Sequence, residues 1–520
     1  MVSFVLNRYW LILGILISLR IVFWVGAFPN SDEAYYWLWG QHLNWSYFDH
    51  PPLHAWIQGI FTTALGRSHF VLRLPTIIST GLLLWLYWLI CQQLYRRQAE
   101  HAFWLTVLLV LSSPLFFLFL AMAWHDHWLI CFGTAASYCL VRFLSQDRLN
   151  TYIWLYSAGV LIGLAGLCKY VALLMGLGFL GAIASHHRWR QLFWNGHLYI
   201  AIAIALLMMA PVFWWNIQHD FYSFQFYLGR SLQTNTPTIQ WLGPVGFLLL
   251  SSLIFGPIHS YLVSKIVTKD PSTQFEATYQ YVALSVFGIS TASLTMLSFK
   301  APVLYYWNIL AYPLLFPLIA GIFLNIYRPG NLQYPRLLKV TAVLGSSIAF
   351  LLIVHYTIFP LSALISETGD DDTRMLYGWS TVADHVEQQI TTLSAPPLLL
   401  TTDYRSAAAL AYSLRDTSVL AISGRIDQFD FWYEATALDG RDGLLLGDQW
   451  HPICPDHLAM FDHTDQPEVI TIQRLGILIK QYTLVRGYGF QAKELNEDPL
   501  SLRYPLAFTT DGEICAPQVP

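Results

Sequence analysis

Two adjacent carboxylates are the first candidates for chemistry in this apolar chain. Asp32 and Glu33 follow the first long apolar run, and aromatic residues, among them Tyr35, come soon after them. Acidic groups beside a membrane helix are costly unless they are solvated, paired or used. If an apolar setting or a second acid raised its pKa, Asp32 could take a proton from a hydroxyl group. The alternative is a solvated loop with an aromatic anchor.

Asp126 opens another apolar run and stands between His125 and His127, with a tryptophan on either side of the three. The positive end of a helix dipole favours a carboxylate at this place, so Asp126 could be only an N-cap. A cap requires no flanking histidines and tryptophans, however. The pattern therefore favours a functional site around Asp126.

Histidines are concentrated in these two segments, at His42, His50, His54, His125 and His127. With nearby acids they could bind a divalent metal, and the candidate ligands are Asp49, His50, His125 and His127. Their spacing matches no recognised metal motif, and imidazoles are equally suited to contacting phosphate oxygens. We therefore expect no required cofactor, and a divalent metal stays an alternative.

Three cations lie at the ends of apolar runs, where a lysine often only extends to the membrane surface. Lys169 lies between two such runs, Lys300 follows another, and Arg73 opens a further one. An anionic ligand at the level of the lipid headgroups, a phosphate or pyrophosphate, would also explain them.

The elements that must position these residues are membrane helices. Of the 520 residues, 55% are hydrophobic and 12% are charged, against roughly 25% charged residues in soluble proteins. This excludes a large soluble enzyme, a disordered chain and a nucleic-acid binder. Runs of spanning length predict about eleven transmembrane helices, at 9–28, 71–94, 102–121, 127–144, 152–168, 170–185, 197–215, 241–264, 279–298, 303–326 and 338–360. The shorter run at 53–66 is typical of a re-entrant or interfacial helix.

The distribution of positive charge predicts the orientation of the helices. With a cytoplasmic N-terminus, twelve Lys and Arg residues before residue 364 fall on the cytoplasmic side and five on the other side. All the candidate residues named above then lie at the extracytoplasmic face. The predicted location is the inner membrane, with several passes.

The charge balance divides the chain into two domains. Residues 1–363 have a balance of +9 and residues 364–520 have a balance of −13. In the second domain strands are expected at 396–403, 418–423 and 444–448, a helix at 406–414, and an antiparallel pair at 469–474 and 478–485. We expect a small extracytoplasmic α/β domain that docks an acceptor or acts as a lid. Cys454 and Cys515 could form one disulfide.

Together the motifs resemble a known family. Asp32-Glu33-Ala34-Tyr35-Tyr36, then Tyr47-Phe48-Asp49-His50-Pro51-Pro52-Leu53, the acidic start of the fourth span, and Gly-Leu-x-x-Leu-x-Lys ending at Lys169 carry the resemblance. They are similar to GT-C fold polyprenyl-phosphate-sugar glycosyltransferases. Within these, the bacterial protein-mannosyltransferase and aminoarabinose-transferase group (glycosyltransferase families 39 and 83) is the most similar, including lipid A and core galacturonosyltransferase-like enzymes.

The resemblance implies a sugar donor linked to polyprenyl phosphate and a lipid, glycan or protein acceptor outside the cytoplasm. The sugar would transfer with inversion. Asp32 would be the general base, supported by Glu33 and Asp126. Lys169 and His50 would hold the donor phosphate.

Two differences from the aminoarabinose transferases bear on phosphate binding. Their acidic pair is followed by Pro-Arg where this chain has Ala34-Tyr35, and their Glu-Lys-Pro-Pro is replaced by Asp49-His50-Pro51-Pro52. Phosphate binding would therefore depend more on Arg73, Lys169 or Lys300. His125, His127, Tyr35 and Asp49 remain further candidates for substrate contacts.

The main alternative is a transporter or flippase for a lipid-linked sugar. Transporters usually contain repeated halves and helices broken near the midplane, and the sequence has no such repeat. The polar residues gather at one face, and the C-terminal domain is large for a transporter, so we favour the enzyme.

Overall fold

The computed structural model describes residues 2–232, 239–325, 333–365, 371–423, 426–433 and 437–491. They form two compact units. The first unit comprises residues 1–24, 44–54 and 70–351, and the second comprises residues 25–43, 55–69 and 352–520. The second unit thus contains the described part of the predicted C-terminal domain and also two short segments from the N-terminal region.

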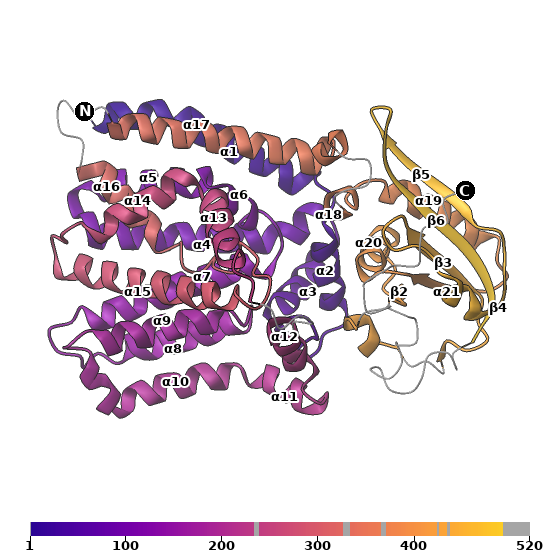
Figure 1. Ribbon diagram of the computed structural model, residues 1–520, viewed down its shortest axis with the longest axis horizontal. Coiled ribbons are helices and arrows are strands. Elements are labelled where there is room, and N and C mark those ends of the chain that lie inside the picture. Colours follow the sequence, from indigo (N-terminus) through magenta and orange to yellow (C-terminus); the bar gives the residue numbers. More distant parts are fainter. Residues whose placement is uncertain are drawn as a thin grey trace. The chain divides into compact units, whose positions relative to one another are not determined.

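The first unit consists of helices joined by short loops (Figure 1). They are α1 (Val2–Gly26), α4 (His69–Tyr95), α5 (Ala99–Ser112), α6 (Pro114–Phe119), α7 (His125–Leu144), α8 (Ile153–Gly166), α9 (Ala172–Ser185), α10 (Gly196–Met208), α11 (Ala210–Gln218), α12 (Tyr222–Leu232), α13 (Gly243–Phe255), α14 (Pro257–Val267), α15 (Gln274–Leu297), α16 (Leu315–Asn325) and α17 (Gln333–Ile353). Helix α7 packs against α8, α8 against α10, and α9 against α15.

Large apolar side chains lie on the outside of these helices. Leu11, Leu207 and Leu249 are exposed on α1, α10 and α13. Exposed apolar faces of this extent are not stable in water and fit a lipid environment. Five helical stretches in the described chain are long and apolar enough to span a membrane, or seven if each of two bent helix pairs forms one span. The fold is that of a multi-pass membrane protein, but the count of eleven is not confirmed.

Four of the predicted spans are not single helices, since 102–121 forms α5 and α6 and 197–215 forms α10 and α11. The run at 241–264 forms α13 and α14, which meet at an angle of 101°. Gly256 joins them with a φ of 121°, which L-residues rarely adopt, and Pro257 opens the next helix. Within 303–326, helix α16 begins only at Leu315.

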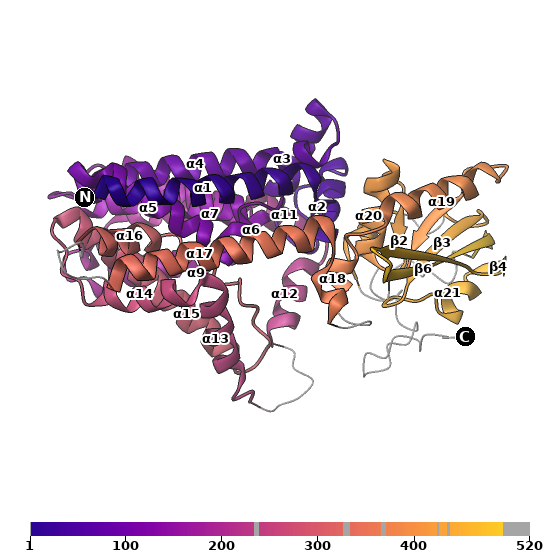
Figure 2. The same cartoon turned by 90° about the horizontal axis from the view of Figure 1, so that it is seen from above.

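The second unit combines helices with one mixed sheet, which Figure 2 shows from another side. Its helices are α2 (Ser31–Gln41), α3 (Leu53–Leu65), α18 (Asp371–Arg374), α19 (Trp379–Thr391), α20 (Tyr404–Leu414) and α21 (Pro455–Ala459), and its strands are β1 (Leu398–Thr401), β2 (Leu420–Ala421), β3 (Gly443–Asp448), β4 (Phe461–Thr464), β5 (Glu468–Arg474) and β6 (Ile477–Phe490). The strand order is β2-β1-β3-β6-β4, and β5 also pairs with β6.

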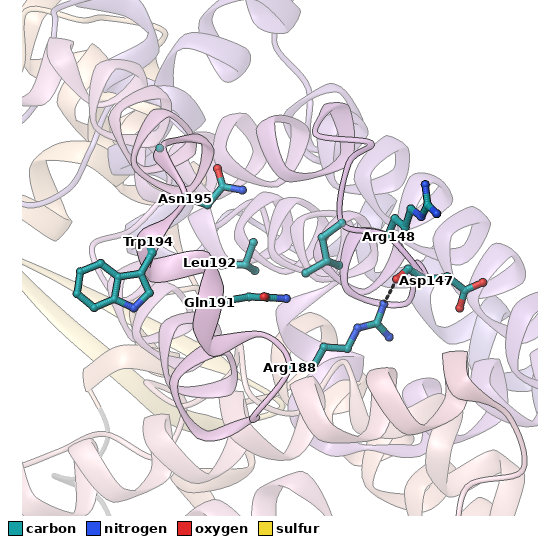
Figure 3. A pocket seen from close by; sticks show the side chains of 9 residues that line it. Asp147, Arg148, Arg188, Gln191, Leu192, Trp194 and Asn195 are labelled. Atoms are coloured by element: carbon teal, nitrogen blue, oxygen red, sulfur yellow. Dashed lines mark hydrogen bonds between the residues drawn. The ribbon is translucent and has the colours of Figure 1, made fainter.

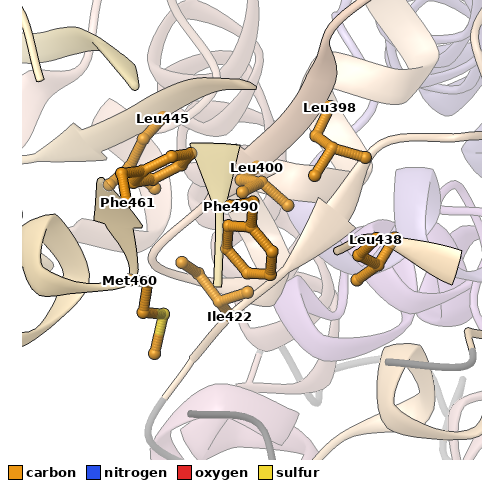
Figure 4. Close-up of a cluster of buried hydrophobic side chains, with 8 residues drawn as sticks. All are labelled: Leu398, Leu400, Ile422, Leu438, Leu445, Met460, Phe461 and Phe490. Carbon is orange, nitrogen blue, oxygen red and sulfur yellow. The ribbon is translucent and has the colours of Figure 1, made fainter. Parts of the chain in front are cut away.

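Strands β1, β2 and β3 are parallel, and β6 runs antiparallel to β3, β4 and β5. The sheet covers a core of eight buried side chains (Figure 4), namely Leu398, Leu400, Ile422, Leu438, Leu445, Met460, Phe461 and Phe490. The predicted strands and the predicted helix at 406–414 all coincide with observed elements, because buried apolar runs bounded by turns specify them well. Cys515 of the suggested disulfide lies outside the described residues.

Helices α2 and α3 approach each other closely within the second unit. A β-carbon placed on Gly40 would lie 2.7 Å from the backbone nitrogen of Gly59. This contact therefore requires glycine at both positions. It sets the position of α2, which carries Asp32 in its first turn.

Candidate active site

A buried ion pair lies at the start of α7. Lys169 Nζ is 3.1 Å and 3.2 Å from the two carboxylate oxygens of Asp126, and the side chains are 14% and 4% exposed. The lysine nitrogen also lies 5.1 Å from the centre of the Tyr306 ring. The N-cap of α7 is Trp124, so Asp126 is not the cap. Its carboxylate instead holds a cation in a largely water-free place.

Four histidine rings form a contiguous group next to this pair. Ring centres lie 4.5 Å apart for His50 and His125, 4.9 Å for His54 and His125, and 5.4 Å for His54 and His127. His54 Nε2 bonds to the carbonyl oxygen of Ala123 at 2.8 Å. The ring of His54 thus lies beside the rings of both His125 and His127.

The hydrogen bonds of His127 determine which of its nitrogens carries the proton. Ser79 Oγ donates to the carbonyl of Thr76 and lies 2.7 Å from His127 Nδ1. Since the hydroxyl proton goes to the carbonyl, Nδ1 donates to Ser79. The Nε2 atom of the neutral ring is then an acceptor, and it is buried without a hydrogen bond to any residue that the structure describes.

Asp49 and His50 are held by α12. The Tyr227 hydroxyl donates to the carbonyl oxygen of Asp49 at 2.5 Å and lies 2.7 Å from His50 Nδ1. Because the carbonyl can only accept, Nδ1 of His50 donates to the hydroxyl oxygen. The ring of His50 is thereby fixed in orientation, and its Nε2 can accept a hydrogen bond while the ring is neutral.

The two remaining cations have different surroundings. Arg73 is completely buried on α4, donates to the carbonyl of Phe23 at 3.1 Å and lies 4.4 Å from the Phe23 ring. Lys300 is exposed in the turn after α15, and its ammonium group makes no ion pair or hydrogen bond within the described ranges. The structure does not bring Lys300 into the group around Asp126.

Asp32 and Glu33 belong to the second unit, in the first turn of α2. Glu33 is fully buried and forms a capping box with Asn30, in which each side chain accepts from the other residue's backbone nitrogen, at 2.9 Å and 3.1 Å. Asp32 is partly exposed. The two acids therefore differ in their surroundings. Glu33 stabilises the start of α2, whereas the Asp32 side chain is accessible.

Tyr35 is packed into the second unit. Its hydroxyl accepts a hydrogen bond from the backbone nitrogen of Gln428 at 2.7 Å, and its ring contacts Tyr404 and Phe429. Only 2% of the side chain is exposed. Tyr35 therefore links α2 to the segment around residue 428.

Among the residues that the structure describes, no group of three or more His, Cys, Asp or Glu side chains could hold a metal ion. The four candidate ligands therefore do not form a metal site there. Hydrogen bonds orient two of the candidates toward protein partners, His50 toward Tyr227 and His127 toward Ser79.

A separate charged cluster lies in the second unit, at the carboxyl ends of β1 and β3. Asp448 forms ion pairs with Lys480 at 3.0 Å and with His451 at 3.2 Å, and His451 is 3.6 Å from Asp403. Burial alone would raise the pKa of Asp448, but Lys480 and His451 together hold it well below its usual range. Burial opposes the charge on His451, yet Asp448 and Asp403 raise its pKa.

Sequence reasoning missed three members of the site in the first unit. They are Tyr227, Ser79 and Tyr306, which contact His50, His127 and Lys169 respectively. Each lies at least 48 residues from its partner along the chain, so no local spacing could indicate the contact. The only signal was the mixture of aromatic and polar residues around Tyr227.

Comparisons with known proteins agree with this geometry. Residues 49–215 match the family model described as dolichyl-phosphate-mannose-protein mannosyltransferase. The chain is 26% identical over 428 residues to the lipid A galacturonosyltransferase RgtD of Rhizobium johnstonii, which covers 78% of this chain and 83% of that protein. The matched family segment begins at Asp49 and contains both Asp126 and Lys169.

Solved structures share the fold. The crystal structure of ArnT from Cupriavidus metallidurans bound to undecaprenyl phosphate matches with a TM-score of 0.61 at 14% identity, over 92% of this chain and 98% of that one. The apo form of the same protein matches with a TM-score of 0.59. The resemblance predicted from the motifs is therefore confirmed, and the chain has the fold of GT-C membrane glycosyltransferases.

Proposed function

We propose that this protein transfers a sugar from a polyprenyl-phosphate carrier to a hydroxyl group of an extracytoplasmic glycolipid of the lipid A or core type, with inversion. The observation that carries the proposal is the buried Asp126–Lys169 pair beside four imidazole rings. A glycolipid acceptor is supported by the name of RgtD, and a polyprenyl-phosphate donor by the ligand of ArnT.

Lys169 is the proposed contact for the donor phosphate. Its ammonium group pairs with Asp126 in a mostly buried place, where a phosphate oxygen would interact strongly with it. His50 in its protonated form would donate a hydrogen bond from Nε2 to the phosphate. Arg73 would contribute positive charge from its buried position on α4. We propose no role for Lys300 in the bound state.

His127 and His125 would orient the sugar. The buried Nε2 of His127 is an acceptor that a sugar hydroxyl could satisfy. Sites that hydrogen-bond a substrate hydroxyl reject analogues without it, because a buried polar atom then stays unpaired. The histidine group would therefore select the substrate. Asp49 would support His50 through the Tyr227 hydroxyl, which contacts the Asp49 carbonyl and His50 Nδ1.

Asp32 is the proposed general base. It takes the proton from the acceptor hydroxyl as the oxygen forms a bond to the anomeric carbon from the side opposite the phosphate. The bond from that carbon to the phosphate oxygen breaks, and its electron pair leaves with the polyprenyl phosphate. The step consumes no nucleotide. Placing the second unit outside the cytoplasm, as the charge distribution predicts, would suit an acceptor in the outer leaflet.

Transfer can be measured directly with purified full-length protein. Polyprenyl-phosphate sugar with a radiolabelled sugar is incubated with lipid A-type acceptors, and label in the acceptor is counted. We expect labelled acceptor with the wild type and none with Lys169→Met. The matched control is Lys265→Met, which removes another lysine of the first unit outside the site. If no acceptor lipid becomes labelled although the donor binds, the proposal fails.

A further inference from the structure

A pocket of about 530 Å³ lies between two loops of the first unit (Figure 3). One loop joins α7 to α8, and the other joins α9 to α10. The polar and aromatic side chains in its lining are Asp147, Arg148, Arg188, Gln191, Trp194 and Asn195.

This pocket is far from the candidate active site. Asp126 lies in the first turn of α7, whereas Asp147 and Arg148 follow the last turn, which ends at Leu144. A helix of 20 residues is roughly 30 Å long at about 1.5 Å per residue. The pocket and the ion pair of Asp126 are thus at opposite ends of the same helix.

The pocket lies where apolar helices end. Helix α7 is a candidate membrane span, and α10 with α11 forms one of the two bent pairs of spanning length. Trp194, in the pocket rim, is 94% exposed. Tryptophan is enriched at the boundary between membrane and water, where its ring meets the headgroups. The pocket is therefore at headgroup level, in the leaflet opposite the active site.

The lining is positively charged and rich in donors. Arg148 and Arg188 face only one acid, Asp147. Arg188 Nη2 donates to the backbone carbonyls of Gln146 and Asp147, which fixes its guanidinium group at the pocket. The exposed side chain of Arg148 makes no hydrogen bond or ion pair in the part of the chain that the structure covers.

We propose that this pocket binds the phosphate of an anionic phospholipid headgroup. Arg148 and Arg188 donate charge-assisted hydrogen bonds to the phosphate oxygens. Gln191 supplies a further donor, and Trp194 lies beside the glycerol region. Basic pockets between membrane helices are suited to such headgroups. Arginines that served only to orient the chain in the membrane would not need to line a pocket together with the side-chain amides of Gln191 and Asn195.

The test measures lipid binding to the full-length protein in detergent by calorimetry. The probes are dihexanoyl phosphatidylglycerol, dihexanoyl phosphatidylcholine and inorganic phosphate. We expect the anionic lipid to bind about tenfold or more tightly than phosphatidylcholine, whose choline cation is repelled by the two arginines, and than inorganic phosphate, which lacks the glycerol and acyl contacts. Arg148→Gln should weaken binding of the anionic lipid about tenfold, and Arg148→Lys should restore much of it.

The matched control is Arg97→Gln, an exposed arginine of the first unit outside the pocket. It should leave the affinity unchanged. Arg148 carries the test because its side chain supports no other residue, whereas Arg188 holds the loop. Unchanged affinity of Arg148→Gln would overturn the proposal. Equal binding of the two lipids would do so as well, and so would phosphate binding as tight as that of the anionic lipid.

Discussion

The Asp126–Lys169 ion pair should affect the stability of the protein as well as its activity. Removing one partner of a buried pair leaves the other charge uncompensated and costs roughly 3–5 kcal/mol, whereas removing both costs much less. We predict that Lys169→Met lowers the thermal unfolding midpoint in detergent. The double variant Asp126→Asn with Lys169→Met should recover most of the loss.

Neither variant should transfer sugar, because the phosphate contact is absent in both. This separates the two roles of the pair, since stability returns in the double variant and activity does not. Near wild-type transfer by the double variant would show that the pair is only structural.

Asp32 and Glu33 should respond differently to loss of charge. Asp32→Asn should reduce transfer by a factor of roughly 10²–10⁴, the usual contribution of a general base. Asparagine keeps the size and one acceptor oxygen of the side chain, so the unfolding midpoint should stay close to that of the wild type.

Glu33→Gln is the control, because glutamine can keep the capping box that Glu33 forms with Asn30. It should preserve both folding and most of the transfer. The transfer rates and unfolding midpoints of Asp32→Asn and Glu33→Gln show whether the two acids differ in this way. Near-normal turnover of Asp32→Asn would remove Asp32 from the base role.

At the residue scale, sequence reasoning named the charged members of the site and missed their neutral partners. Asp126 and Lys169 came from a motif resemblance, and they prove to be paired. Tyr35 stood in the same motif but is buried against Phe429, almost 400 residues away in the chain. Motifs indicate which residues matter, whereas their contacts depend on tertiary packing that spacing does not encode.

At the scale of elements, the contact between α2 and α3 should tolerate no added atom. A β-carbon on Gly40 would lie 2.7 Å and 2.9 Å from backbone atoms of Gly59, which cannot move aside like a flexible side chain. We predict that Gly40→Ala costs about 1–3 kcal/mol of stability and also lowers transfer, because α2 carries Asp32.

Gly81→Ala in α4 is the matched control, since nothing lies within 4 Å of its added carbon. It should be neutral or slightly stabilising, because alanine restricts the unfolded chain. Unfolding midpoints of both variants test the contact. Equal stability of the two variants would show that α2 and α3 are not tightly packed.

The charged cluster at the ends of β1 and β3 predicts a pH-dependent stability. The pKa of His451 is raised in the folded state, so its contribution is fully present below its unfolded value of 6.5. It is lost as the pH rises through the folded pKa. Asp448 has a lowered pKa, so its contribution is present above 3.8 and is lost only in stronger acid.

The unfolding midpoint of the wild type should therefore exceed that of His451→Gln most clearly between about pH 4 and 6.5, with the gap narrowing at higher pH. Burial and Arg405 lower the pKa of His451, but Asp448 and Asp403 raise it, and the net direction is upward. If the difference in unfolding midpoint between the wild type and His451→Gln stays constant from pH 5 to 9, His451 stabilises the protein only by packing.

The elements themselves were largely predictable, with informative exceptions. The strands around Leu398 and Leu444 follow from short buried apolar runs, and the helices follow from long ones. The bend at Gly256 was missed, although the Gly256-Pro257 pair is a turn signal, because the hydropathy of 241–264 continues through it. Because hydropathy is averaged over a window of many residues, it does not reveal a helix break that two residues cause.

At the scale of the whole molecule, the division into units departs from a simple cut at residue 364. Residues 25–43 and 55–69 belong with the C-terminal part of the chain. Composition could not indicate this, since the association of these segments with the later elements depends on contacts such as that of Tyr35 with Gln428.

One measurement tests most directly whether this molecule is a transferase or a carrier of lipid-linked sugars. Proteoliposomes receive a polyprenyl-phosphate sugar that carries ³H in the sugar and ³²P in the phosphate, together with an acceptor glycolipid. We predict that the two labels separate in equal amounts, with ³H in the acceptor and ³²P in free polyprenyl phosphate. Movement of the intact donor across the bilayer, with both labels still joined, would contradict glycosyl transfer by this protein.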